Sequence, residues 1–221
     1  MFNNLFDIWK GKDFLESVEE DFSAMLEISS KMFKNVKKFI SAELTDSELQ
    51  QEIYDMDKDI NNLERKIRKR ILEHMAMQPS CDVSASLILM SVIKDAERLG
   101  DYLKNIAEVR TILNGKIDEK CYNQFFGDLE YQITGMFVAA KKAFVDSDTD
   151  LAKEVGKKKT VLGPKCEDII QDIANSDMPA RDAVAYALIA RYCKRLVAHL
   201  GNIATSVILP FEELDYYRPE S

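Results

Sequence analysis

The sequence predicts an all-α protein of six long helices, arranged as two tandem three-helix bundles that run up and down like spectrin repeats. Apolar residues recur at helical spacing along six stretches, which is the primary signal for amphipathic helices. The 221 residues include only eight glycines and five prolines, too few for a turn-rich β-protein. At an offset of 97 residues, Asn105-Ile106-Ala107 aligns with Asn202-Ile203-Ala204, so the third helices of the two halves share a pattern. A repeat of this length is a supersecondary unit that buries a shared core.

The periodicity sets the order of the elements. It predicts helices over residues 14–40, 45–77, 83–113, 121–144, 147–175 and 180–209. Short connections between such long helices favour antiparallel neighbours. We therefore divide the chain into an N-terminal preface over residues 1–12, a first repeat over 13–115, a second repeat over 116–210 and a C-terminal tail over 211–221.

Capping and breaking residues support these boundaries. Thr45 and Glu48 form a capping box at the start of the second helix. Pro79 disfavours helical backbone at the residue before it, so the second helix should end near residue 77. Asn114-Gly115 ends the third helix. Gly163-Pro164 lies inside the fifth helix and is expected to kink or split it.

Composition excludes several classes of protein. The formal net charge of −8 argues against a nucleic-acid binder, whose affinity depends on neutralising phosphates with Lys and Arg. The most apolar run, residues 87–93, is far shorter than the ~20 residues of a membrane span. No basic segment precedes the apolar patch at the N-terminus, so we expect no signal peptide. The four cysteines are dispersed and fit free thiols in a reducing compartment, and we expect a soluble cytoplasmic protein.

Two acidic faces are candidates for a metal site. Glu97 and Asp101 repel each other at i and i+4 on one face of the third helix, and this predicts a positive group between them. Asp57, Asn61 and Glu64 lie along one face of the second helix. Because the two helices should be antiparallel neighbours, these faces converge. Oxygen ligands favour Mg²⁺, Ca²⁺ or Mn²⁺, whereas iron and zinc accept carboxylates but usually add His or Cys.

A solvated, ion-paired face is the alternative interpretation of the same residues. Asp101 could pair with Lys104 or with Arg98, and Glu97 could pair with Lys94. Neither of the two histidines sits in an E-x-x-H arrangement, so a ferritin-like di-iron site has no support. Both interpretations stay open at this point.

The stretch AERLGDYLKNIAE around Glu97 and Asp101 resembles the motif of the PhoU family. That family has two repeats of three helices, each with an E(D)-x-x-x-D signature in its third helix. Residues 56–64, MDKDINNLE, are similar to the family's D-K-x-[IV]-N-x-x-E stretch in the second helix. The resemblance implies a cytoplasmic protein that restrains phosphate uptake and the phosphate-starvation response by contacting a phosphate transporter and a sensor histidine kinase. It also implies metal ions, iron and zinc among them, held by the acidic motifs.

The second repeat departs from the family pattern. Lys194 stands where the family has Glu, and Ala198 stands where it has Asp. Its second helix offers Gly156-Lys157-Lys158-Lys159-Thr160 in place of acidic residues. Lysines cannot hold a divalent cation, so either this site is lost or the ammonium groups replace the metal as countercharge. His199 follows the degenerate motif, and we expect it at the surface or at a helix cap.

These observations together predict a regulatory accessory protein of phosphate homeostasis with one metal-competent repeat. The sequence shows no catalytic motif, so we expect no enzyme. The expected partners are a phosphate transporter subunit, a sensor histidine kinase or both, and the expected assembly is a homodimer. The alternatives are a structural helical adaptor without bound metal and an enzyme that uses a carboxylate-bound metal.

Overall fold

The computed structural model describes residues 12–42, 47–77, 83–113 and 117–219, with the side chains of residues 12–16 outside that description. Within these ranges all regular structure is helical, which confirms the all-α class. The six long helices are α1 (Lys12–Ser41), α2 (Ser47–Met77), α3 (Val83–Glu108), α4 (Glu119–Val145), α5 (Thr149–Ala174) and α6 (Ala180–Thr205). Two short 3₁₀ turns follow α3 and α6, namely η1 (Val109–Thr111) and η2 (Phe211–Glu213).

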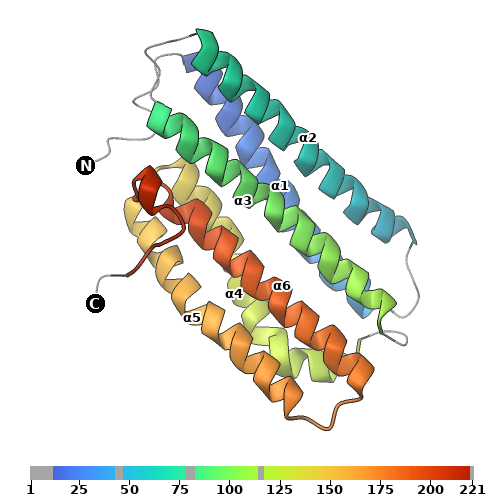
Figure 1. Ribbon diagram of the computed structural model, residues 1–221. Coiled ribbons are helices and arrows are strands. Elements are labelled where there is room, and N and C mark those ends of the chain that lie inside the picture. Colours follow the sequence, from blue (N-terminus) through green and yellow to red (C-terminus); the bar gives the residue numbers. More distant parts are fainter. Residues whose placement is uncertain (1–11, 43–46, 78–82, 114–116, 220–221) are drawn as a thin grey trace.

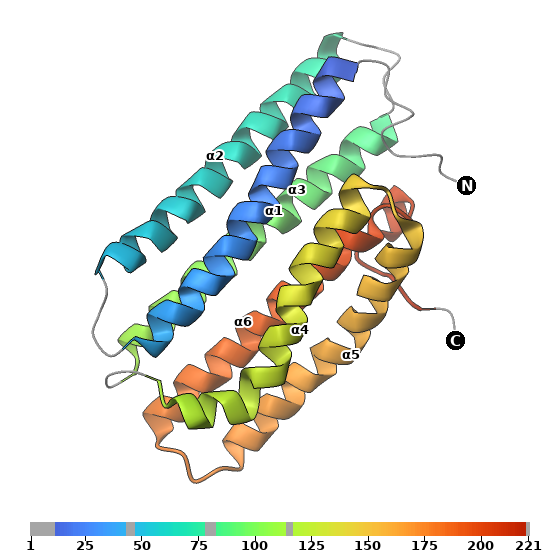
Figure 2. The same ribbon diagram turned by 180° about the vertical axis from the view of Figure 1, so that it is seen from behind.

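The helices form two groups that lie side by side along one long axis. Helices α1–α3 pack together, helices α4–α6 pack together, and the two groups meet where α3 contacts α6 and where α1 contacts α4 (Figures 1 and 2). The groups follow the two expected repeats, although the exact domain limits stay a prediction. Among the described residues, no helix combines the length and apolar composition needed to cross a membrane.

The contact between the groups is apolar where α1 meets α4. The rings of Phe22 and Phe144 have centroids 4.5 Å apart, and those of Phe33 and Phe137 have centroids 5.6 Å apart. All four side chains are buried. Since aromatic rings bury large apolar areas and prefer tilted contacts of this kind, these pairs hold the two groups as one core.

A buried arginine holds the end of the first helix. The guanidinium of Arg110 donates hydrogen bonds to the carbonyl oxygens of Phe39 at 2.7 Å and of Ile40 at 3.3 Å, near the C-terminus of α1. It also lies 5.2 Å from the centroid of the Phe39 ring. A cation at this place neutralises the unpaired carbonyl groups and the negative end of the helix dipole. This contact fixes α1 against the end of α3.

Of the kink or split expected in the fifth helix, the split is wrong, and the kink stays a prediction. Helix α5 runs without interruption from Thr149 to Ala174, with Pro164 inside it. Pro164 is exposed, as is Thr160 one turn before it, so the carbonyl that loses its hydrogen bond faces water. Gly163 precedes the proline and has no Cβ to clash with the ring. The proline is tolerated because it lies on the solvent side.

Other helix ends differ by one turn from the expectation. Helix α3 ends at Glu108 and continues as the 3₁₀ turn η1, and α6 ends at Thr205 rather than near residue 209. The amides of Ile208 and Leu209 both donate to the carbonyl of Thr205 at 3.1 Å, so the chain ends in a tight turn before Pro210, which disfavours helical backbone at the residue preceding it. Thr45, Pro79 and Asn114-Gly115, together with the preface up to residue 11, lie outside the described residues.

Gly201→Ala is expected to lower the free energy of unfolding by about 1–3 kcal/mol. A Cβ atom at this position would lie 2.4 Å from Cδ and 2.9 Å from Cβ of Lys159, and the Cβ of a lysine cannot rotate away. Helices α5 and α6 would therefore have to separate. Urea unfolding of the variant measures the effect.

The matched control is Gly135→Ala in α4, where no atom lies within 4 Å of an added Cβ. Because alanine favours the helix over glycine by about 0.5–1 kcal/mol, this variant should be as stable as the wild type or more so. Equal stability of the two variants would contradict the close contact between α5 and α6.

A candidate acidic site between the second and third helices

The predicted acidic residues of α2 face α3. Ile53, Ile60 and Ile67 are fully buried along α2, and this seam turns the neighbouring polar positions toward the groove between the two helices. Asp57 is 7% exposed and Glu64 is 8% exposed. Carboxylates with so little exposure need charged or hydrogen-bonding partners, because their burial is otherwise costly.

Gly100 lets the two helices approach closely at this site. A Cβ added to it would lie 3.0 Å from Cδ1 of Ile60 and 3.5 Å from Oδ1 of Asp57. The amide of Asn61 lies at the same place and donates to Oδ2 of Asp57 at 3.5 Å. The predicted α2 residues Asp57 and Asn61 are thus in contact with one another, and Asp57 lies against Gly100 of α3.

The positive group at the site is a lysine of α3. The ammonium of Lys104 donates a hydrogen bond to Oδ2 of Asp57 at 2.7 Å and lies 3.6 Å from Oδ1 of Asp101. Burial disfavours the charge of Lys104, but the hydrogen bonds and charges of Asp57 and Asp101 raise its pKa on balance. Lys104 therefore joins one acidic residue from each helix.

Two arginines neutralise the other carboxylates. Arg98 donates to Oδ2 of Asp101 at 2.9 Å, and its Nε lies 3.6 Å from Oε2 of Glu97. Arg68 lies 2.8 Å from Oε1 of Glu64, one turn away on α2. The ion pairs of Asp101 with Arg98 and Lys104, which the alternative interpretation predicts, are thus present. Glu97 contacts Arg98 rather than the predicted Lys94.

Negative charge remains in excess around Glu97. Burial raises the pKa of this carboxyl, the charge of Asp101 raises it further, and Arg98 opposes both. Glu64 and Asp57 add smaller contributions in the same direction as Asp101. The four predicted carboxylates therefore share one electrostatic environment, in which the negative charge at Glu97 is disfavoured.

The donor atoms suit a hard metal ion, but their arrangement does not hold one as it stands. Carboxylate and amide oxygens are the ligands that Mg²⁺, Ca²⁺ and Mn²⁺ prefer. In the part of the chain that the structure describes, no three His, Cys, Asp or Glu residues are grouped so that they could hold a metal ion. The ammonium of Lys104 stands between Asp57 and Asp101, where a bridging ion would have to bind. A metal would therefore have to displace Lys104.

In the second repeat a lysine also lies between the second and third helices, but it comes from the second helix, α5, rather than from the third, α6. Lys159 of α5 donates to Oδ1 of Asn202 on α6 at 2.6 Å and packs across Gly201. At the offset of 97 residues, Gly201 corresponds to Lys104. The first repeat thus holds its lysine on the third helix and the second repeat holds its lysine on the second helix.

Among the described residues, no carboxylate forms an ion pair with Lys159 as Asp57 does with Lys104. Burial lowers its pKa, while the charges of Asp215 and Asp95 oppose that shift. Lys194, which replaces the family's glutamate, forms an ion pair with Glu167 on α5. The lysines of the second repeat therefore add positive charge to this side of the fold, and whether they replace a metal stays a prediction.

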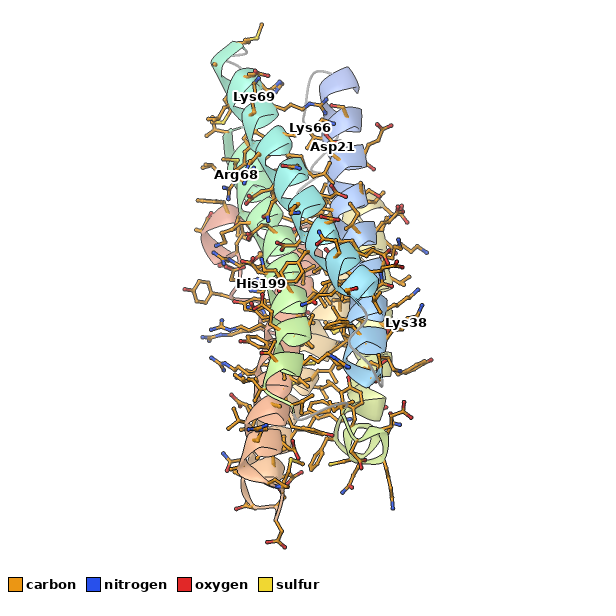
Figure 3. All side chains as sticks on the ribbon, turned by 90° about the vertical axis from the view of Figure 1, so that its right-hand side faces the viewer. Asp21, Lys38, Lys66, Arg68, Lys69 and His199 are labelled. Carbon is orange, nitrogen blue, oxygen red and sulfur yellow. The ribbon has the colours of Figure 1, made fainter. Side chains whose placement is uncertain are left out.

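The sequence interpretation missed a polar contact between the two repeats. Nδ1 of His199 lies 2.7 Å from Oδ1 of Asp95, and its ring stacks on that of Tyr102 with centroids 5.6 Å apart. Asp95 is only 4% exposed at its side chain. His199 therefore belongs to the seam between α3 and α6 and is neither a surface residue nor a cap (Figure 3). Asp95 occupies an otherwise apolar face of α3, and a charged residue on such a face is the signal in the sequence from which a buried polar contact could be predicted.

The family model of the PhoU domain matches residues 22–109, which cover most of α1 to α3. The match ends before the second repeat, where lysines replace the acidic motif. The match thus lies within the first repeat, which carries the acidic residues.

Curated relatives match nearly the whole chain. The phosphate-specific transport system accessory protein PhoU homolog of Clostridium acetobutylicum is 22% identical over 205 residues, which are 89% of this chain and 93% of the relative. The corresponding homolog 1 of Thermotoga maritima is 26% identical over 203 residues, which are 88% of this chain and 85% of the relative. Both matches extend across the two repeats.

Solved structures share the fold. PhoU from Pseudomonas aeruginosa superposes with a TM-score of 0.77 at 22% identity, covering 90% of this chain and 97% of that one. The phosphate transport system regulatory protein PhoU from Streptococcus pneumoniae gives a TM-score of 0.76 at 16% identity, with 94% and 97% covered. The domain match within the first repeat, the relatives of similar length and the shared fold agree with one another: residues 22–109 match the PhoU domain, and most of the chain is similar to PhoU accessory and regulatory proteins of phosphate transport systems.

Proposed function

We propose that this protein restrains phosphate uptake and phosphate-starvation signalling by binding a phosphate transporter subunit, a sensor histidine kinase or both. The observation that carries the proposal is the match to accessory proteins over 89% of the chain. A rod of packed helices with long polar faces suits protein–protein contact, because it offers extended rigid surfaces.

Deletion of the gene in its native host tests this function. In phosphate-replete medium, we expect the rate of phosphate uptake and a phosphate-starvation reporter to rise several-fold, because the restraint is lost. A plasmid copy of the chain should restore both values. A Lys69→Ala copy serves as a second complementing copy, since Lys69 is 77% exposed and its ion pair with Glu73 lies within α2. Unchanged uptake and reporter levels in the deletion strain would contradict the proposed role.

The acidic groove carries the second part of the proposal. We propose that a hard divalent cation competes with Lys104 for Asp57, Asn61, Glu64, Glu97 and Asp101. The oxygen donors and the excess negative charge at Glu97 support a cation there. The ion pair between Lys104 and Asp57 favours the second candidate, a regulatory adaptor that needs no metal.

We also propose that the protein acts in the cytoplasm as a homodimer. Support for self-association comes from large apolar side chains that stand exposed on the described surface, among them Tyr131 at 80% and Val138 at 65% on α4. Exposed apolar groups close together on one helix are typical of interaction surfaces. Light scattering on the purified protein measures its mass directly, and a monomer at micromolar concentration would contradict this part of the proposal.

A further inference from the structure

The C-terminal segment after α6 forms one wall of a pocket in the second repeat. Figure 1 shows this segment returning past η2 toward α5. The pocket, here named the tail pocket, has a volume of about 860 Å³. Organic ligands commonly occupy pockets of about 300–1,000 Å³, so the tail pocket has the size for a whole small molecule. Its walls include Lys153, Lys157, Ile208, Leu209, Tyr216 and Arg218.

Specific contacts hold the tail in place. The ammonium of Lys159 donates to the carbonyl oxygen of Asp215 at 3.3 Å, and the side chain of Leu214 is buried. Asp215 has a φ of 74°, a left-handed conformation that turns the chain back at this point. The ring of Tyr217 covers Gly156, where an added Cβ would lie 2.4 Å from its Cε1 atom. The tail pocket is thus a built feature of the fold.

Three cations line the tail pocket in a chain whose net charge is −8. Lys153 and Lys157 lie one turn apart on α5, and Arg218 comes from the tail. Lys153 lies 3.5 Å from Asp150, while no ion pair within the described residues engages the charged groups of Lys157 or Arg218. Both are exposed. Lysine and arginine side chains with free donors are the usual ligands of phosphate groups.

The remaining walls suit an organic body rather than a bare ion. Ile208 and Leu209 supply apolar surface, and the ring of Tyr216 is 76% exposed beside them. An exposed tyrosine ring can stack on a planar ring of a ligand. Glu213 also lines the pocket, and its carboxylate would accept hydrogen bonds from hydroxyl or amino groups.

We infer that the tail pocket binds a phosphorylated small molecule with a planar ring, of the nucleoside phosphate class. The phosphate groups lie against Lys157 and Arg218, and the ring lies against Tyr216. The site is on the repeat that has lost its acidic motif. It is separate from the groove of Lys104, and neither proposal depends on the other.

Titration calorimetry of the full chain with ATP, at low ionic strength and without divalent cations, tests this inference. We expect ATP to bind at least about tenfold more tightly than adenosine or pyrophosphate, since each lacks one of the two matching parts. Lys157→Ala and Arg218→Ala should each weaken ATP binding about tenfold, the usual size of one charged hydrogen bond. Tyr216→Ala should weaken ATP binding without changing the affinity for pyrophosphate.

A glycine variant separates the shape of the tail pocket from its charge. Gly156→Ala displaces the ring of Tyr217 and should weaken ATP binding without removing any charge. Gly135→Ala and Lys69→Ala, in α4 and α2, are the matched controls and should bind like the wild type, with circular dichroism confirming that every variant folds. No binding of ATP by the wild type at millimolar concentration would overturn the inference. Equal binding of pyrophosphate and ATP, or equal loss in Lys69→Ala and Lys157→Ala, would also overturn it.

Discussion

Phe144→Ala is expected to lower the free energy of unfolding by about 3–5 kcal/mol, the largest effect of any substitution considered for this chain. The ring is 1% exposed and packs against Phe22 of the other repeat with centroids 4.5 Å apart. Its removal leaves a cavity at the contact between α1 and α4, and the long rigid helices on both sides limit how far the cavity can close. Chemical denaturation, followed by circular dichroism, measures the loss.

Phe211→Ala is the matched control for this substitution. Phe211 is 41% exposed, whereas Phe144 is 1% exposed, so the truncation of Phe211 removes less buried surface, opens no enclosed cavity and should cost only about 1–2 kcal/mol. Because Phe144 contacts the other repeat, the variant should also weaken the coupling between the repeats. A loss below about 1 kcal/mol for Phe144→Ala would show that α1 and α4 do not share a core.

Lys104→Met is expected to lower the free energy of unfolding by about 2–3 kcal/mol and to create a response to divalent cations. The substitution leaves Asp57 and Asp101 without their shared ammonium, next to the already repulsive Glu97. Added Mn²⁺ should then raise the melting temperature strongly in the variant and weakly in the wild type, because only the variant leaves the groove free.

Lys58→Met on the exposed face of α2 is the control. Lys58 pairs with Asp55, and the two side chains are 66% and 55% exposed, so the variant should be as stable as the wild type. No Mn²⁺ response should appear in this variant beyond that of the wild type. If Lys104→Met also fails to respond to Mn²⁺, the acidic groove is a structural ion-pair network and the metal-free adaptor is the correct function.

The sequence was sufficient for the fold class and for the faces of the helices. The spacing of Ile53, Ile60 and Ile67 predicts the seam of α2, and burial along this seam confirms it. The same periodicity turned Asp57 and Glu64 toward α3, although the presence of a metal at the site stays a prediction. These features follow from positions within one helix, which a single sequence records directly.

Features that depend on the distance between helices were not predictable. The sequence predicts an ion pair of Lys104 only with Asp101 on its own helix, whereas the shortest contact of Lys104 is with Asp57 across the groove. The tolerance of Pro164 depends on which side of α5 faces water. The contact of His199 with Asp95 depends on how the two repeats pack. Each of these contacts depends on how a helix is rotated about its axis or how far it lies from its neighbour, and the pattern of residues within one helix does not specify either quantity.

The two repeats differ in which helix carries the lysine of the groove, because Lys104 lies on α3 and Lys159 lies on α5. The two halves of the molecule are therefore not equivalent. Two identical repeats would have an internal twofold axis, and a partner could then bind in either of two orientations with equal affinity. Here one groove pairs its lysine with Asp57 and the other pairs its lysine with Asn202. The two grooves thus differ in charge, and a partner surface that complements one is mismatched at the other. If the proposed partner spans both halves, we expect the divergence of the second repeat to select a single orientation for it.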